Sequence, residues 1–349
     1  MEFTHGGDWA AFEQEYGALP LDFSASLSPF GMPEAVRAAA IDAIRDAARY
    51  PDPKCRSLRA ALTERHGLPA EQIVCGAGAA DLIYRIAHTL RPKQALLPAP
   101  TFSEYARAVR EAGGAVRLHP LRQEDDLRPD GSFLDAIGAD TELVFLCQPN
   151  NPTGLLADGA LLRRVLRRCG EVGAVLVADE CFLDLTAEPE RFSLEGELAA
   201  SNHLVILKAF TKTFAMAGLR LGYALCGDPV LAARLQSCGQ PWAVSAPAQA
   251  AGLAALRERE YEKQVRAYLC SERPRVAREL EGLGFRVLPG EANYLLFFSR
   301  RTDLDDCLRR RGFLIRSCAD FSGLGPGWYR IAIREREDND ALLRALREV

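Results

Sequence analysis

The sequence predicts an α/β fold in which helices cover both faces of a mostly parallel sheet. Between residues 73 and 207, short apolar runs alternate with helix-forming stretches, as in strands that are joined by crossover helices. The chain has 349 residues, 48% of them hydrophobic, which is enough for a large core and favours two domains. We expect a large domain of residues 50–245 and a smaller α/β domain built from both termini, residues 1–49 and 246–349.

The N-terminal part is expected to hold little regular structure before its first helix. Glycine and proline interrupt residues 1–33 repeatedly, so this segment is predicted to be irregular. An alanine-rich helix is predicted from residue 33 to about residue 48, because a proline followed by a glutamate favours a helix start. A proline-rich turn separates it from a second helix at residues 57–66, with Ser57 as its N-cap.

The middle of the chain contains the alternation that predicts the sheet. Apolar runs predict strands at residues 73–75, 95–97, 115–118, 143–147, 174–178 and 204–207. Helices are predicted between them, at residues 104–112 and 161–169 and in a stretch that ends at Leu90.

The C-terminal part begins with a long helical segment and then alternates again. Residues 229–283 are predicted to be largely helical, with breaks at Pro241 and Pro247. Further strands are predicted at residues 294–298, 313–316 and 329–333, with helices near residues 305–310 and at the C-terminus.

Composition excludes several classes of function. Charged residues make up 26% of the chain and the net charge is −4, which argues against general nucleic-acid binding. No apolar run is long enough to predict a membrane span, and the first five residues do not resemble a signal peptide. The ten cysteines form no Cys-x-x-Cys pair, so we expect reduced thiols, no metal site and a cytoplasmic protein.

The run from Leu207 to Tyr223 carries the strongest functional signal. It continues a predicted buried strand and places Lys212 just past the end of that strand. A ligand crevice is expected at the carboxyl ends of the strands in an open α/β sheet. Arg220 follows eight residues later, between two glycines that allow tight turns.

This run resembles the Schiff-base lysine segment of the class I/II, fold type I, pyridoxal-phosphate enzymes. Its pattern is Thr-Lys-x-x-Ala-x-x-Gly-Leu-Arg-Leu-Gly-Tyr. The resemblance implies the fold of that family and pyridoxal 5′-phosphate as the cofactor. It also implies that Lys212 forms an imine with the cofactor aldehyde and that Arg220 holds the cofactor phosphate.

Two further motifs follow predicted strands in the order found in this family. Asp179, in Asp-Glu-Cys-Phe, is implied to pair with the pyridine nitrogen and keep it protonated. Asn151, in Asn-Asn-Pro-Thr-Gly, is implied to donate to the ring hydroxyl of the cofactor. The alternatives are an acid that pairs with a neighbour and a simple turn.

Other residues are implied to hold the cofactor phosphate. The small residues of Gly-Ala-Gly-Ala-Ala precede a helix, so the amides of Gly78 and Ala79 can approach a phosphate at its N-terminus. Thr211 offers a hydroxyl, and Arg220 a charge-assisted contact. Such a loop by itself is a weak signal.

Two aromatic residues match the family less specifically. Phe102, in Pro-Thr-Phe-Ser-Glu-Tyr, is implied to stack on the pyridine ring, although a core aromatic fits the pattern equally well. Tyr50, in Arg-Tyr-Pro-Asp, resembles the tyrosine that reaches the cofactor phosphate of the neighbouring subunit. That role implies a homodimer with shared sites, and a tyrosine held in a turn is the alternative.

Arginines and one histidine are candidates for substrate binding. Arg330 lies on a late predicted strand and resembles the family arginine that clamps the substrate α-carboxylate. A substrate phosphate could be held by His5, Arg316 or Arg334, and each of these could equally be a solvated surface residue.

Four segments resemble the threonine-phosphate decarboxylases within this family. They are residues 5–8, 21–25, 240–245 and 314–324. The predicted reaction is the decarboxylation of L-threonine O-3-phosphate to 1-aminopropan-2-ol phosphate, in cobalamin biosynthesis. The alternatives are an aminotransferase, such as histidinol-phosphate aminotransferase, and a non-catalytic cofactor-binding regulator, which lacks support because no DNA-binding segment precedes the domain.

The chain also departs from the family pattern at five positions. Alanine or serine stands where the family usually carries serine, threonine or asparagine, at Ser26, Ser28, Ala77, Ala209 and Ser245. These departures leave the predicted fold unchanged and leave the substrate open.

Overall fold

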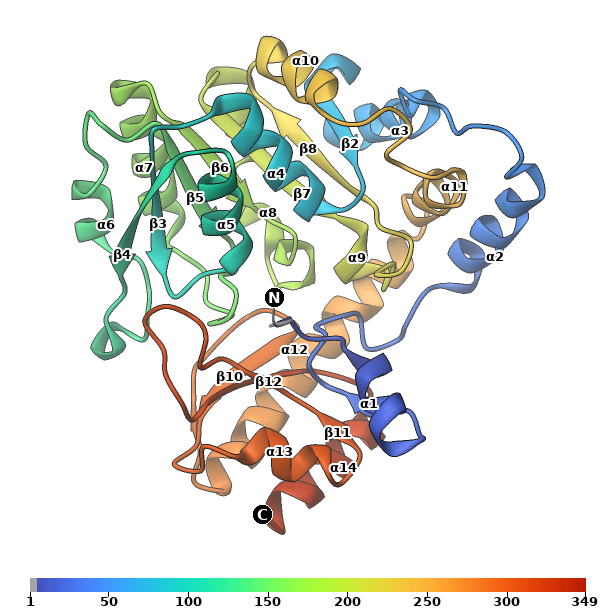
Figure 1. Ribbon diagram of the computed structural model, residues 1–349, viewed down its shortest axis with the longest axis vertical. Coiled ribbons are helices and arrows are strands. Elements are labelled where there is room, and N and C mark those ends of the chain that lie inside the picture. Colours follow the sequence, from blue (N-terminus) through green and yellow to red (C-terminus); the bar gives the residue numbers. More distant parts are fainter. Residues whose placement is uncertain (1–4) are drawn as a thin grey trace.

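In the computed structural model, which describes residues 5–349, the larger lobe is built on a seven-stranded sheet (Figure 1). The strand order is β2-β8-β7-β6-β5-β3-β4. The strands are β2 Ile73–Gly76, β3 Gln94–Ala99, β4 Ala115–Pro120, β5 Leu143–Cys147, β6 Val175–Asp179, β7 Leu204–Ala209 and β8 Gly222–Cys226. Strands β3 to β7 run parallel, and β8 is antiparallel to both β7 and β2. The predicted α/β fold with a mostly parallel sheet is confirmed.

Helices pack on both faces of this sheet because its central strands are apolar on both sides. On β7, Val205 and Leu207 face one buried cluster, and Leu204 and Ile206 face the other. The first cluster includes side chains of α4 Ala79–Leu90, α5 Ser103–Glu111 and α10 Pro229–Cys238. The second includes side chains of α2 Glu34–Ala43, α3 Arg56–His66, α7 Gly159–Val172 and α11 Ala246–Ala255.

The smaller lobe contains two short sheets and the C-terminal helices (Figure 1). A four-stranded sheet has the order β12-β13-β10-β9, and β1 pairs in parallel with β11. The strands are β1 Leu21–Asp22, β9 Arg286–Val287, β10 Tyr294–Phe298, β11 Phe313–Leu314, β12 Arg316–Ser317 and β13 Trp328–Ala332. The helices of this lobe are α1 Trp9–Tyr16, α13 Leu304–Arg309 and α14 Arg336–Arg347. The 24-residue α12, Arg259–Gly282, connects the two lobes.

Short helical turns complete the fold. They are α6 Gly131–Asp135, α8 Pro189–Phe192, α9 Phe210–Thr213, and the 3₁₀ turns η1 Ile44–Asp46, η2 Ala70–Gln72, η3 Gln123–Asp125, η4 Leu183–Leu185 and η5 Glu195–Ala200.

Several sequence-based expectations are wrong in detail. Residues 1–33 are not uniformly irregular, because Asp8 caps α1 by accepting a hydrogen bond from the Ala11 amide, and β1 follows. Residues 1–4 lie outside the described part of the chain. Ser57 is not an N-cap: α3 begins one residue earlier, and the Asp52 carboxylate accepts the Arg56 amide at 2.6 Å. The helix predicted to reach residue 48 ends at Ala43 and continues only as a 3₁₀ turn.

The division into two domains stays a prediction. The predicted boundaries assign both α2 and α11 to the small domain. In the structure, Val36 and Ala40 of α2 lie in the same buried cluster as Ala248 and Ala251 of α11, together with the large sheet. No helix within residues 5–349 has the length and apolar character needed to cross a membrane.

Candidate active site

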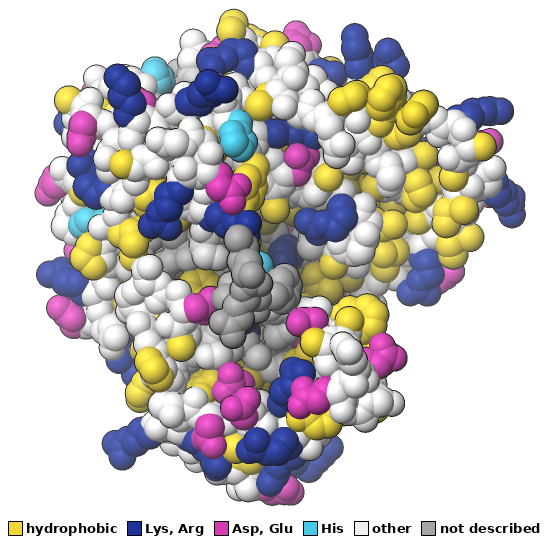
Figure 2. Space-filling model, viewed as in Figure 1, with side chains coloured by type: hydrophobic (Ala, Val, Ile, Leu, Met, Phe, Trp, Pro, Cys, Tyr) yellow, Lys and Arg dark blue, Asp and Glu magenta, His cyan; other side chains and the backbone are white. Residues whose placement is uncertain are grey.

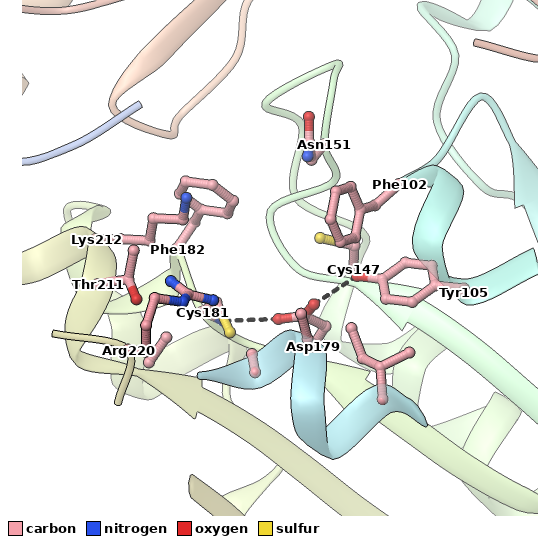
Figure 3. Close-up of a pocket in the computed structure, with 14 residues that line it drawn as sticks. Phe102, Tyr105, Cys147, Asn151, Asp179, Cys181, Phe182, Thr211, Lys212 and Arg220 are labelled. Carbon is pink, nitrogen blue, oxygen red and sulfur yellow. Dashed lines mark hydrogen bonds between the residues drawn. The ribbon is translucent and has the colours of Figure 1, made fainter. Parts of the chain in front are cut away.

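A pocket lies where the carboxyl ends of β5, β6 and β7 meet α4 and α5. The parallel strands bring loops from distant parts of the sequence to this edge of the sheet. The pocket is lined by seven of the predicted site residues: Ala79, Phe102, Asn151, Asp179, Thr211, Lys212 and Arg220 (Figure 3).

Lys212 lies in α9, the single helical turn that follows β7. Burial lowers the pKa of its amine, and the nearby charges of Arg330 and Arg220 lower it further, to about 8. The amine also lies 5.1 Å from the centre of the Phe182 ring. A lysine with this pKa is partly neutral near physiological pH, as a nucleophile or a proton carrier requires.

Asp179 is the last residue of β6 and is buried. Its Oδ1 accepts a hydrogen bond from the Cys181 amide at 3.0 Å, and its Oδ2 accepts one from the Tyr105 hydroxyl at 2.5 Å. Among the described residues that line the pocket, Asp179 is the only carboxylate, whereas Lys212 and Arg220 are both cationic. The pocket therefore suits a ligand that is anionic at one end and cationic at the other.

Asn151 lies in the turn after β5 and connects the two lobes. Its side-chain oxygen accepts a hydrogen bond from Arg330 of β13. Arg330 also donates to the Ser24 carbonyl oxygen at 3.0 Å, and it is buried. Because the amide oxygen of Asn151 is used by Arg330, its NH₂ group is the end that can donate to a ligand.

The start of α4 and the Arg220 loop form an anion-binding corner. Gly78 is the N-cap of α4, with a φ of 90° that favours glycine. A Cβ atom on Gly78 would lie 2.6 Å from Nη2 of Arg220, so only glycine allows the guanidinium to lie there. Thr211 lines the same pocket. Backbone amides at a helix N-terminus, a hydroxyl and a guanidinium are groups that bind phosphate.

Phe102 is the N-cap residue of α5 and lines the pocket. Its ring meets the Tyr105 ring edge-on at 5.5 Å and lies 5.7 Å from the His5 ring. Nε2 of His5 lies 2.9 Å from Glu104, so the N-terminal segment passes close to the site.

The other predicted residues are engaged elsewhere. Tyr50 is 78% exposed and stacks on Trp242 at 4.4 Å. Arg316 lies opposite Arg330 on the neighbouring strand and pairs with Asp320 at 2.7 Å. Arg334 pairs with Asp338 at 2.8 Å and donates to a backbone carbonyl at 3.1 Å. The structure thus brings Arg330 against the site, whereas Arg316 and Arg334 are held by their own carboxylates.

Sequence reasoning missed other pocket residues. Cys147, Cys181, Ala80 and Ile83 line the pocket. Ala80 and Ile83 follow the Gly-Ala-Gly loop at helical spacing, so the same helix face could have been predicted from the start of α4. The cysteines follow strand ends, but nothing in their spacing distinguishes pocket cysteines from core cysteines.

Comparisons with known proteins agree with this geometry. The model of the family "Aminotransferase class I and II" matches residues 20–346. The chain is 38% identical to the threonine-phosphate decarboxylase of Salmonella typhimurium, over 99% of this chain and 96% of that one. It is 31% identical to histidinol-phosphate aminotransferase 2 of Archaeoglobus fulgidus, over 95% of this chain and 96% of that one. The crystal structure of the histidinol-phosphate aminotransferase from Clostridium acetobutylicum has a TM-score of 0.87 and 29% identity, with 94% of this chain and 98% of that chain covered.

The pocket residues also fit the cofactor of this family. The cationic corner at Gly78 and Arg220 matches the phosphate of the cofactor. The buried carboxylate of Asp179 matches its pyridine nitrogen, and the Lys212 amine, whose pKa is lowered, matches its aldehyde. The chain therefore belongs to the aminotransferase class I and II family, with the fold type I architecture and pyridoxal 5′-phosphate as its cofactor.

Proposed function

We propose that this enzyme decarboxylates L-threonine O-3-phosphate to 1-aminopropan-2-ol phosphate, a reaction of cobalamin biosynthesis. The observation that carries the proposal is the 38% identity to the Salmonella typhimurium decarboxylase across nearly the full length of both chains. The identity to the Archaeoglobus fulgidus aminotransferase is lower, at 31%.

The charges around the pocket support a substrate with two anionic groups. Arg220 is assigned to the cofactor phosphate, which leaves Arg330 for the substrate carboxylate. His5 lies next to Phe102, and Arg316 lies next to Arg330. These two residues are the nearer candidates for the substrate phosphate, and Arg334 is the third. Threonine phosphate carries both a carboxylate and a phosphate, whereas histidinol phosphate has no carboxylate.

Each proposed residue role follows from the chemistry of its surroundings. When bound, pyridoxal phosphate withdraws electrons from the bond that breaks at the α-carbon of the amino acid. Asp179 provides a fixed negative charge at the pyridine nitrogen, and Asn151 provides a hydrogen-bond donor at the ring oxygen. Nζ of Lys212, with a pKa of about 8, can both accept a proton and return it to the α-carbon.

The choice between decarboxylation and transamination depends on how the substrate is oriented. A decarboxylase holds the bond from the α-carbon to the carboxylate perpendicular to the pyridine ring, whereas a transaminase holds the Cα–H bond there. A phosphate anchor outside the ring plane can select the first orientation. The aminotransferase remains the second candidate, because the Clostridium acetobutylicum structure shares the fold at 29% identity.

Two parallel assays test the proposal. The purified enzyme with pyridoxal phosphate is incubated with threonine phosphate, and separately with histidinol phosphate and 2-oxoglutarate. We expect carbon dioxide from the first mixture and no glutamate from the second. Glutamate without carbon dioxide would contradict decarboxylation and favour the aminotransferase. Lys212→Ala is the control, and it should abolish either activity.

A further inference from the structure

Tyr105 lies beneath the pocket, in the first turn of α5, and its side chain is fully buried. Its ring stacks on Phe145 at 4.7 Å and meets Phe102 edge-on at 5.5 Å. Its hydroxyl donates a hydrogen bond of 2.5 Å to Oδ2 of Asp179 (Figure 3). Tyr105 therefore contacts both the aromatic residue and the carboxylate of the site, and its own position is fixed by two ring contacts and one hydrogen bond.

Asp179 has few other groups that stabilise its charge. Its second oxygen accepts the Cys181 amide, and the Cys181 thiol, a weak donor, is the other side chain that hydrogen-bonds to it. The thiols of Cys147 and Cys181 lie nearby, and burial raises the pKa of both, so they stay neutral. The hydrogen bonds that a buried carboxylate accepts stabilise its negative charge, and the Tyr105 hydroxyl supplies one of the few at Asp179.

Tyr105 is suited to act only as a donor. Burial raises the pKa of its hydroxyl well above the usual value, and the charge of Asp179 raises it further. The hydroxyl therefore keeps its proton at any physiological pH. A hydrogen bond of 2.5 Å from a hydroxyl to a carboxylate is short and charge-assisted, and such bonds are among the stronger hydrogen bonds in proteins.

We propose that Tyr105 is a positioning residue, whose hydroxyl orients the Asp179 carboxylate so that Asp179 keeps the pyridine nitrogen of the cofactor protonated. The proposal rests on the role given to Asp179 and is independent of which substrate the enzyme uses. Without the hydroxyl, the carboxylate loses this hydrogen bond and its fixed orientation, and it stabilises the protonated pyridine nitrogen less well.

The test is the ¹⁵N NMR signal of pyridoxal phosphate labelled at the pyridine nitrogen and bound to the full-length enzyme. The wild type is expected to show a protonated nitrogen. Tyr105→Phe keeps the ring packing and loses only the hydroxyl, so its signal should move toward that of Asp179→Asn. The dissociation constant of the cofactor, measured by equilibrium dialysis, should rise by about tenfold, as expected for the loss of one hydrogen bond to a charged group.

Two further variants separate this role from simple stability. Tyr329→Phe removes another buried tyrosine hydroxyl, one that accepts the Leu304 amide in the small lobe, and should leave the ¹⁵N signal unchanged. Incorporation of 4-aminophenylalanine at position 105 keeps a donor on the ring and should retain the protonated signal, even if Tyr105→Phe fails to fold.

Two results would overturn the role proposed for Tyr105 while leaving that of Asp179 in place. One is an unchanged ¹⁵N signal in folded Tyr105→Phe while Asp179→Asn shifts it. The other is a lost protonated signal in the 4-aminophenylalanine variant. If Asp179→Asn itself leaves the signal unchanged, the role of Asp179 is wrong and the inference fails with it. Neither result bears on the carbon dioxide assay, which tests the substrate.

Discussion

Lys208 and Lys212 are close in sequence but differ in their chemical surroundings. Burial opposes the charge of Lys208, but Asp184, Glu180 and Glu195 outweigh it and raise the pKa well above the usual value. Burial also opposes the charge of Lys212, and the cations Arg330 and Arg220 add to this effect, so its pKa falls to about 8. Of these two lysines, Lys212 is therefore the one with a reactive amine near neutral pH.

Borohydride reduction should attach the cofactor to Lys212. Reduction of the enzyme with bound pyridoxal phosphate, followed by peptide mapping, is expected to place the label on the peptide that contains Lys212. Lys208 lies in the same segment and is the internal control, because its amine is held by three carboxylates. A label on Lys208, Lys54, Lys93 or Lys263 would contradict the site assignment.

The rate of cofactor capture by the apoenzyme should depend on the pKa of Lys212. Only the neutral amine attacks an aldehyde, so the rate should rise with pH and level off above about 8. Arg330→Gln removes a cation that lowers this pKa, so the midpoint should move to higher pH. Arg334→Gln is the matched control, since Arg334 is not among the groups that shift the pKa of Lys212 most and pairs with Asp338 instead, and its midpoint should stay in place. Stopped-flow absorbance measures both midpoints.

At the scale of elements, one ionic cluster around the buried Lys208 joins six segments of the large lobe. Lys208 of β7 lies 3.1 Å from Glu180 after β6, 3.3 Å from Asp184 of η4 and 2.9 Å from Glu195 of η5. Glu195 also contacts Nδ1 of His66 at the end of α3, and His66 reaches the Tyr223 hydroxyl of β8. The cluster closes the face of the sheet opposite the pocket.

Lys208→Met should destabilise the fold by about 3–5 kcal/mol at pH 7, because it leaves the buried carboxylate of Glu180 without its cation. Burial raises the pKa of Glu180 even when Lys208 is present. Without the lysine this carboxyl should protonate more readily, so part of the loss should be recovered as the pH falls toward 5. Urea denaturation at both pH values measures this change. Lys263→Met, at an exposed ion pair, should change stability by less than about 1 kcal/mol.

The sequence predicts the long, strongly apolar elements better than the short ones. The strands at residues 143–147 and 294–298 agree with the structure at both ends, because apolar runs with polar neighbours have clear limits. The helix at Trp9–Tyr16 was missed because glycines precede it and its cap, Asp8, gives only a local signal. Strand β8 was missed because Gly222 begins it and it continues the site motif.

The site was predicted to the extent that residues follow strand ends. Lys212, Asp179 and Asn151 follow strands that the sequence predicts, and all three line the pocket. The pairing of Arg316 with Asp320 and of Arg334 with Asp338 was not predicted. Each aspartate is the i+4 neighbour of its arginine and competes with any substrate for the guanidinium group. Tyr105 appears in the motif, but its bond to Asp179 joins residues 74 positions apart and needs the fold.

For the whole molecule, exposed apolar residues mark one side of the large lobe. The side chains of Ile41, Ile44, Tyr50 and Trp242 are all exposed. In Figure 2, hydrophobic side chains gather on the side of the large lobe where α2 lies in Figure 1. Clustered exposed apolar groups are typical of protein interfaces, which supports the homodimer implied by Tyr50.

Shared sites in such a dimer can be tested by subunit mixing. We expect homodimers of Tyr50→Phe and of Lys212→Ala to have low activity. Mixed dimers should recover part of it, because one of their two sites has both an intact Lys212 and an intact Tyr50 from the other chain. Activity after co-refolding, with analytical ultracentrifugation to confirm the dimer, measures this recovery. A fully active monomer would contradict the shared site.

The two-residue period of β6 has a consequence for how insertions and deletions would act on this enzyme. Asp179 and Glu180 are adjacent carboxylates, but one faces the pocket and the other faces Lys208. A slip of one residue in this strand would turn each acid to the opposite face, so that the longer side chain faces the cofactor side and the shorter one faces the lysine side. The position of each acid along the chain thus decides the face of the sheet to which its carboxylate points. A single residue inserted before them would place both charges on the wrong faces, although the neighbouring sequence would be unchanged.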